Sequence, residues 1–207
     1  MKNLPSLKDL HSDLKTLQKD DELTVLLNNE PPEAWVKTHP FIKGYKYVPI
    51  ERVEFLLKKI FRKYKIEILR EGTAFNGVYV VVRVHYLNPI SNEWDYHDGI
   101  GAAQLQTKKG QSPADLSNIN NGALSMAFSI AKTVAVKDAC DHFGRLFGSD
   151  LNRKQQMTYT VDLTIIELTP EHPNWQKVQT ALDNGTATIE QVKKRYNITP
   201  ENEALLM

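Results

Sequence analysis

Apolar residues recur every three or four positions in several segments of the chain, which is the period of an amphipathic helix. The first thirty residues carry leucines at this spacing, and residues 50–64 carry the same pattern directly after Pro49. The segment 121–147 has an apolar stripe with small residues at its middle: Leu124, Phe128, Ala131, Ala135, Ala139, Phe143 and Leu146. We therefore expect one or two N-terminal helices, a helix over 50–64 and one long helix over 121–147.

Prolines and threonines mark the ends of shorter helices. Pro31 and Pro32 end the N-terminal helical segment and allow a short helix over 33–38, which Pro40 would stop. Near the C-terminus, Thr188 and Thr199 have the side-chain oxygen that caps a helix start. Short helices are expected there over 174–182, 189–196 and 201–206.

Between these helical segments the pattern changes to the alternation of β-strands. Strands are predicted over 65–70 and 78–86, with a turn around Gly72 and Asn76-Gly77, and a further strand from Trp94 toward Gln106 after the turn at 88–92. The alternation places four residues of the middle strand on one face, namely Val78, Val80, Val82 and Val84. A three-stranded meander follows.

The predicted fold class is α+β, with an antiparallel β-meander packed on a long α-helix and helical extensions at both ends. We expect an N-terminal extension over 1–30, a core over 31–168 and a small helical tail over 169–207. The polar, turn-rich segment 107–121 is predicted to be a mobile loop, and 159–167 is strand-like.

Composition places the chain among ordinary globular proteins, with 41% hydrophobic and 25% charged residues. Cys140 is the single cysteine, which excludes an intrachain disulfide and a cysteine-rich zinc site. Its position beside the apolar stripe favours a core residue over a nucleophile.

No apolar run approaches the roughly 18 residues of a membrane span. We expect a cytoplasmic protein without a membrane partner.

Positive charge is concentrated in one segment although the whole chain has a net charge of +1. Residues 31–70 hold ten lysines and arginines against four acids. Such a segment attracts polyanions by counterion release, independently of their sequence. The alternative is a solvated helix face.

Catalytic motifs are scarce, and we expect neither an enzyme nor a cofactor or metal. The chain has no P-loop and no H-x-x-x-H pair. Glu93, Asp95, His97 and Asp98 would serve a metal-dependent nuclease, which is a lesser alternative. Alternation places Asp98 on the other face of its strand from the first three, and this weakens a convergent metal site.

A binding constellation remains, in which Lys37, Lys43 and Lys46 alternate with aromatic residues: Trp35, Phe41, Tyr45 and Tyr47. Cations that follow phosphates and rings that stack on bases are typical of proteins that bind single-stranded nucleic acid. The alternative is that the aromatic residues anchor this segment in the core.

Four motifs occur in an order that resembles a known family. They are Tyr47-Val48 with Arg52-Val53, then Arg83-Val84-His85-Tyr86, then Tyr96-His97-Asp98 with Gly99-Ile100-Gly101, and finally the run 135–149, which reads AVKDAC and ends in RLFGS. This set is similar to the Rad-fifty-two superfamily of single-strand annealing proteins. The segment 32–37 resembles the bacteriophage annealing proteins of the Sak and RecT kind.

The resemblance implies a protein that anneals complementary DNA strands without ATP during phage recombination and repair in a bacterial cytoplasm. It implies homo-oligomers, as rings or helical filaments, that hold single-stranded DNA and the annealed duplex intermediate. A host single-strand binding protein or a phage exonuclease is a further expected partner, bound through the C-terminal tail. A protein that protects single strands or loads a recombinase without annealing is the main alternative.

Carried over to this sequence, the resemblance places Arg145 among the arginines of the DNA groove, on the polar side of the long helix. Asp141 and His142 occupy two positions where the family has cations, and this shifts more of the expected grip to the lysines before the meander. The residues that we expect to contact nucleic acid are Lys37, Lys43, Lys46, Arg52, Lys132, Arg145 and Arg153.

Overall fold

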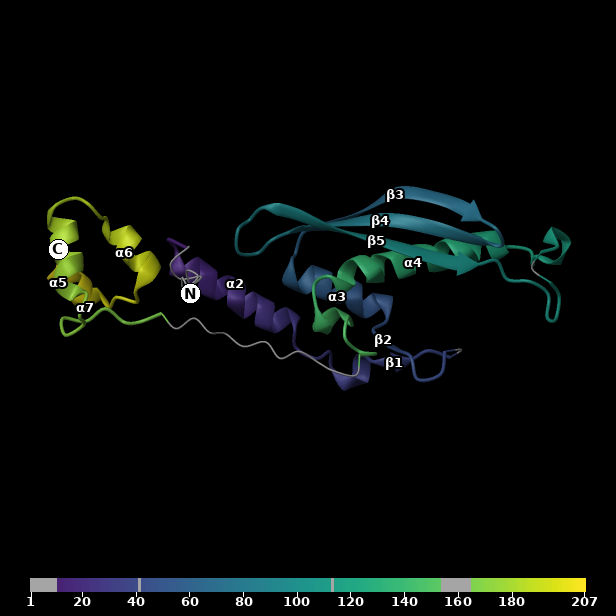
Figure 1. Ribbon diagram of the computed structural model, residues 1–207, viewed down its shortest axis with the longest axis horizontal. Coiled ribbons are helices and arrows are strands. Elements are labelled where there is room, and N and C mark those ends of the chain that lie inside the picture. The colour runs from purple at the N-terminus through teal and green to yellow at the C-terminus, as the bar shows by residue number, and fades with distance from the viewer. Residues whose placement is uncertain (1–10, 41, 113, 154–164) are drawn as a thin grey trace, which may run out of the picture. The chain divides into compact units, whose positions relative to one another are not determined.

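The computed structural model describes residues 11–40, 42–112, 114–153 and 165–207 (Figure 1). The chain divides into two compact units, one formed by Met1–Leu26 with Tyr159–Met207 and the other by Leu27–Thr158. Phe41 and most of the strand predicted over 159–167 lie outside the described residues. So do the leucines at the start of the first predicted helix, Leu7 and Leu10.

The second unit is built on a three-stranded antiparallel sheet in the order β3-β4-β5, which confirms the predicted meander. Its strands are β3 (Tyr64–Ala74), β4 (Gly77–Leu87) and β5 (Trp94–Gln104). β3 is longer than predicted, because Gly72 pairs with Tyr79 inside the ladder and the turn lies beyond Ala74. A Cβ at Gly72 would meet Tyr79 Oη at 2.8 Å and the nearest ring carbons at 2.9 Å, so the absence of a side chain here leaves space for the tyrosine.

The core lies on one face of this sheet, and the predicted alternation of β4 is confirmed. Val78, Val80, Val82 and Val84 are buried there, and they pack with Val53, Leu56 and Leu57 of α3 (Ile50–Ile60). Pro49 immediately precedes α3, as predicted from its position before the apolar pattern. Cys140 is fully buried in the same core, and burial raises the pKa of its thiol far above neutrality.

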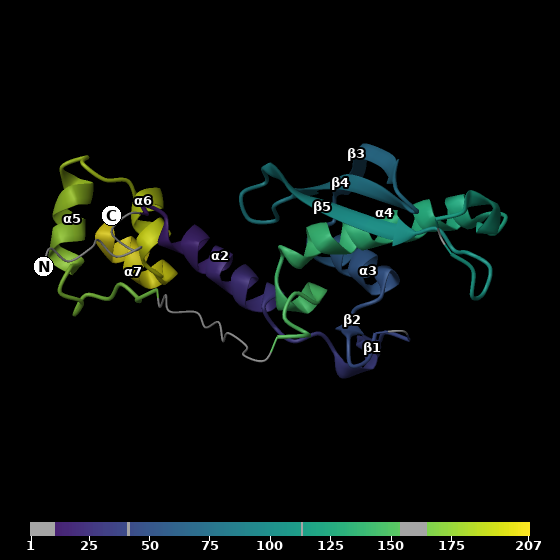
Figure 2. The same ribbon diagram turned by 45° about the vertical axis from the view of Figure 1, so that its right-hand side comes forward.

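The long helix α4 (Ala123–Asp141) packs against β4 and β5 (Figures 1 and 2). Its buried face consists mainly of alanines, and the β5 glycines Gly99 and Gly101 lie against its backbone. A Cβ at either glycine would overlap α4 backbone atoms, so the two elements pack backbone to backbone. The predicted apolar stripe is wrong at Leu124, whose side chain is directed away from the core and is 49% exposed.

The end of α4 also differs from the prediction. The helix ends at Asp141, and a separate 3-10 turn, η3 (Arg145–Phe147), follows after Gly144. Gly144 has a φ of 124°, which side-chain-bearing residues rarely adopt, and this breaks the helix. Phe143, Leu146 and Phe147 are nevertheless buried, and that is why the apolar periodicity continued past the break.

The segment before α3 is a short hairpin. The short helix predicted over 33–38 is wrong: η1 (Glu33–Trp35) is a single 3-10 turn, and the chain continues into β1 (Lys37–Thr38), which pairs with β2 (Lys46–Tyr47). Farther along, the loop predicted over 107–121 contains η2 (Leu116–Asn118) and a bridge between Thr107 and Ile119.

The first unit joins chain segments that are far apart in the sequence. Its helices are α2 (Leu14–Leu27, whose last residue belongs to the second unit), α5 (Trp175–Asp183), α6 (Ile189–Arg195) and α7 (Pro200–Leu206). Leu168, Trp175, Val192 and Leu206 form its core. The predicted caps are confirmed, since Thr188 and Thr199 accept hydrogen bonds from Gln191 and Asn202 backbone amides. Lys194 pairs with Asp13 at 3.7 Å.

Candidate nucleic-acid interface

The β1–β2 hairpin displays the lysines that the sequence singled out. Lys37 and Lys46 lie on its two strands, Lys43 lies in its loop, and all three are exposed. The hairpin is held in place at Lys46, whose backbone N–H donates to Asn152 Oδ1 at 2.8 Å and whose carbonyl accepts from Asn152 Nδ2 at 2.9 Å. The Lys46 backbone is therefore fixed by Asn152, while its charged side chain is exposed to solvent.

A groove of about 670 Å³ separates the hairpin from α4. Tyr45, Tyr47, Ile130 and Val134 are among the residues that line it, and Tyr45 is 44% exposed. Lys137 Nζ lies 4.6 Å from the centre of the Tyr47 ring, a cation–π contact. The groove therefore offers apolar and aromatic surface bordered by ammonium groups.

Two carboxylates share the groove with these lysines. Asp138 is already engaged, because its Oδ2 accepts a hydrogen bond from the Ile100 amide at 2.9 Å. Burial, with the neighbouring Asp138 carboxylate, raises the pKa of Asp141 to about 6, although Lys137 and His142 act in the opposite sense. Burial lowers the pKa of Lys137, and Asp141 and Glu51 oppose that shift. The charge of the groove thus depends on pH near neutrality.

Arg145 lies elsewhere than predicted. It belongs to η3 instead of the polar side of the long helix, so it cannot form a helical i, i+4 pair with Asp141. Its Nη2 donates to Glu30 Oε1 at 2.6 Å. The Arg145 side chain is only 11% exposed, whereas that of Glu30 is 66% exposed. Loss of Arg145 would therefore disturb local packing as well as remove a charge.

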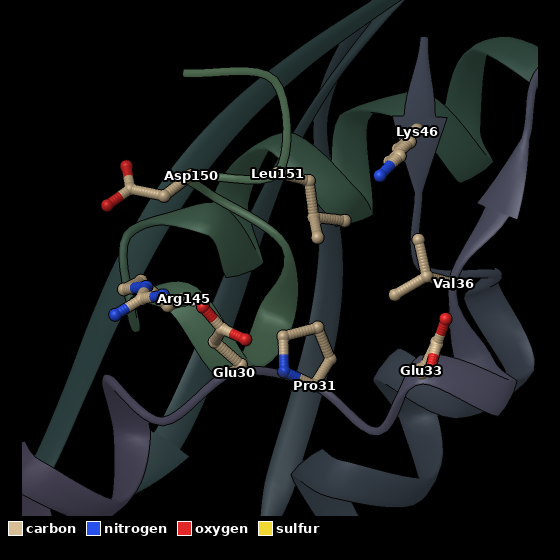
Figure 3. Close-up of a pocket in the computed structure, with 8 residues that line it drawn as sticks. All are labelled: Glu30, Pro31, Glu33, Val36, Lys46, Arg145, Asp150 and Leu151. Atoms are coloured by element: carbon tan, nitrogen blue, oxygen red, sulfur yellow. Dashed lines mark hydrogen bonds and ion pairs between the residues drawn. The ribbon is translucent and has the colours of Figure 1, made fainter. Parts of the chain in front are cut away.

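Arg145 and Lys46 line one pocket of about 300 Å³ (Figure 3). Figure 3 shows the Glu30 carboxylate beside the Arg145 guanidinium, with Pro31 next to it. The other lining residues are Glu33, Val36, Asp150 and Leu151. Lys46 is also among the residues that line the groove along α4, so this residue adjoins both spaces.

The remaining predicted contacts are dispersed. Lys37 pairs with Glu51 at 3.8 Å, and Arg153 pairs with Asp150 at 3.2 Å. The Arg52 guanidinium lies 5.1 Å from the centre of the Trp35 ring. Trp35 packs against the core, as the alternative interpretation of the aromatic residues required.

Lys132 is separated from the hairpin lysines. It lines a different hollow, together with Ile68, Glu71, Val80, Phe128 and Ser129. Sequence reasoning missed Lys137 as a site residue. The signal that identifies Lys137 is its contact with Tyr47, a residue ninety positions earlier in the chain, and periodicity cannot show that contact.

The acidic residues of β5 do not converge. Asp98 lies on the outer face of the sheet and accepts two hydrogen bonds from Arg83, at 2.7 and 2.8 Å, and these lower the pKa of the carboxyl group. Asp95 and His97 lie on the opposite face, where Tyr86 Oη donates to Asp95 Oδ2 at 3.1 Å. Within the described ranges, no three His, Cys, Asp or Glu side chains are grouped so that they could hold a metal ion.

The sequence matches no protein-family model, and no curated protein matches it significantly. Among the helices in the described part of the chain, none is long and apolar enough to cross a membrane. The hairpin, the groove and the Arg145 pocket are therefore the basis for a functional proposal.

Proposed function

We propose that this protein binds single-stranded DNA along the β1–β2 hairpin and anneals complementary strands without ATP. The observation that carries the proposal is the groove beside α4, where the hairpin places Tyr45, Tyr47 and Lys46 opposite Lys137. Lys37 and Lys43 are exposed on the same hairpin and add two ammonium groups near the groove, although neither lines it. This combination suits a flexible strand better than a rigid duplex, because a strand can offer phosphates and base faces together.

The mechanism requires no chemical step. Ammonium groups neutralise phosphates, and the aromatic and apolar wall accommodates bases without reading their sequence. Pairing with a second strand then releases stacking free energy of roughly 1.4 kcal/mol per step, which drives annealing without a nucleotide cofactor. The role of the protein is to hold a strand extended until its complement pairs.

One hairpin covers only a short stretch of DNA. Three lysines neutralise about three phosphates, whereas stable pairing needs many consecutive bases. The proposal therefore includes homo-oligomers, rings or helical filaments, that align several hairpins along one strand. It also includes the annealed duplex as an intermediate, and a single-strand binding protein or an exonuclease as a partner in recombination.

Salt dependence tests the binding part of the proposal. The affinity for an oligothymidine, measured by fluorescence anisotropy, should fall steeply between about 50 and 200 mM salt, with a logarithmic slope of about −0.7 for each phosphate contact. Oligomers of deoxyadenosine and deoxycytidine should give nearly the same slope. A flat profile would contradict phosphate binding.

An annealing assay separates the proposal from its rivals. Complementary labelled oligonucleotides should pair faster with the protein than without it, in the absence of ATP, and non-complementary strands should give no signal. Binding without acceleration would identify a protecting or loading protein. Magnesium-dependent degradation of the labelled DNA would identify a nuclease.

Asp141 should make binding depend on pH. Above its pKa of about 6 the carboxylate is charged and repels phosphate, and below that pH the repulsion is lost. At pH about 7.5 we expect Asp141→Asn to bind oligothymidine on the order of threefold more tightly than the wild type, as one fewer negative charge lines the groove. The ratio of the two affinities should approach one at pH about 5. A ratio that stays constant from pH about 5 to 7.5 would place Asp141 away from the DNA.

A further inference from the structure

The segment that precedes the hairpin passes directly over the turn that carries Arg145. A Cβ at Gly144 would meet Asn28 Oδ1 at 2.7 Å and the Leu27 carbonyl oxygen at 3.0 Å, so a glycine is needed for this crossing. Glu30 follows two residues later and reaches Arg145. The segment 27–30 therefore lies across the turn as a strap.

The backbone on either side of Glu30 limits where its carboxylate can go. A residue before proline is held in extended conformations, and Pro31 itself is buried against the pocket. The side chain of Glu30 is still mostly exposed, so its carboxylate can leave Arg145 for water without unfolding the strap. The contact is preformed but open to exchange.

A carboxylate on a guanidinium occupies the place that a phosphate would take, because both anions offer oxygen pairs to the same N–H donors. Lys46 lines the same pocket, and it also borders the groove in which we place the strand. A phosphate held by Lys46 on its pocket side would thus face the space that Arg145 also lines.

We propose that Glu30 is an internal competitor, which covers Arg145 until an extended strand already held on the hairpin lysines displaces it. This inference rests on the proposed function, since it assumes that a strand binds at Lys46. Glu30 then determines specificity: it discriminates between a polyanion that is anchored at several points and an isolated phosphate or nucleotide.

The discrimination follows from effective concentration. A tethered group that is linked by a short segment competes at an effective concentration on the order of millimolar. Free phosphate well below that level cannot displace Glu30. A strand bound at Lys46 presents its next phosphate at a similar effective concentration, and therefore can.

The exchange changes the affinity and leaves the salt dependence almost as it is. The salt slope counts the cations that leave the DNA when its phosphates are neutralised, and a phosphate that reaches Arg145 loses its cation whether or not it displaces Glu30. Loss of the Glu30 charge therefore removes a competitor without adding a phosphate contact.

Glu30→Gln tests this directly in the full chain. We expect its affinity for a 30-nucleotide oligothymidine at about 100 mM salt to rise on the order of fivefold, which is the value of one partly exposed ion pair. The salt slope should stay close to that of the wild type, because the same phosphates are neutralised in both proteins. Inorganic phosphate in the millimolar range should compete more effectively against the variant than against the wild type.

Glu33→Gln is the matched control, because Glu33 lines the same pocket and carries the same charge, whereas the ion pair with Arg145 is made by Glu30. It should give less than half of the affinity change and leave the salt slope as it is. A second variant, Glu30→Asp, keeps the charge but shortens the reach, and it should tighten binding to a smaller extent. Glu30→Asp replaces Glu30→Gln as the test variant if Glu30→Gln shows no thermal unfolding transition and is therefore not folded.

The outcomes separate the two levels of the proposal. If the wild type binds oligothymidine with a salt-dependent affinity, but Glu30→Gln and Glu30→Asp bind no more tightly than Glu33→Gln, Glu30 is only a structural partner of Arg145 and the inference is overturned. If the wild type itself shows no salt-dependent binding, the proposed function fails first.

Discussion

Replacing Gly101 by alanine will lower the free energy of unfolding by more than about 3 kcal/mol, because the new methyl group has no room. A Cβ at this position would overlap the Ala131 carbonyl oxygen and the Ala135 amide nitrogen, which are rigid backbone atoms of α4. The helix can relieve the overlap only by moving away from β5, and that movement opens the alanine-lined contact along the core. Urea denaturation followed by circular dichroism measures the change.

Ala102→Val is the matched control on the same strand. Ala102 is exposed and pairs with Tyr79, so a larger side chain there projects away from α4. Valine also favours strands, and the control should change the free energy of unfolding by less than about 0.5 kcal/mol. A Gly101→Ala protein as stable as this control would show that α4 and β5 pack less closely than the structure indicates.

The meander was predictable because its information is local. Every second residue of β4 is a buried valine: Val78, Val80, Val82 and Val84. This alternation identifies the buried face of the strand without knowledge of the elements that pack against it. α3 was equally readable, since Pro49 and the apolar spacing are contained within one segment. In each case neighbouring residues determine the element.

The end of α4 was not predictable from periodicity. Phe143, Leu146 and Phe147 keep an apolar rhythm and are buried, so the pattern continues although the helix has ended. Gly144 was visible in the sequence, but an isolated glycine is tolerated within helices. What requires the break is the crossing of Asn28 over Gly144, a contact between residues more than one hundred positions apart.

The candidate site was predictable as a cluster of charges but not as a set of pairs. The hairpin lysines were singled out from their spacing with Tyr45 and Tyr47, and of the three only Lys46 lines the groove beside α4. The ion pair of Arg145 with Glu30 joins residues that are far apart in the sequence, so a local sequence pattern cannot reveal it. The cation–π contact of Lys137 with Tyr47 also joins distant residues and could not be predicted for the same reason.

Reversing the charge of Lys43 and Lys46 together should weaken single-strand binding by on the order of 100-fold at about 100 mM salt and abolish annealing. Each lysine accounts for one phosphate contact, and a glutamate at the same place adds repulsion. The salt slope should fall by about 1.4, which corresponds to two contacts. Both side chains are exposed, so the thermal unfolding midpoint should stay close to that of the wild type.

Charge reversal of Lys58 and Lys59 distinguishes a contact from a general field. These lysines belong to the same basic segment and are also exposed, but they lie in the last turn of α3, outside the hairpin. The pair changes the net charge of the protein by the same amount. Because screening limits exposed charges to a range of about 8 Å at physiological salt, the α3 variant should lose less than about fivefold in affinity. Equal losses in the two double variants would mean that DNA is attracted by the whole basic segment and that the hairpin is not its binding site.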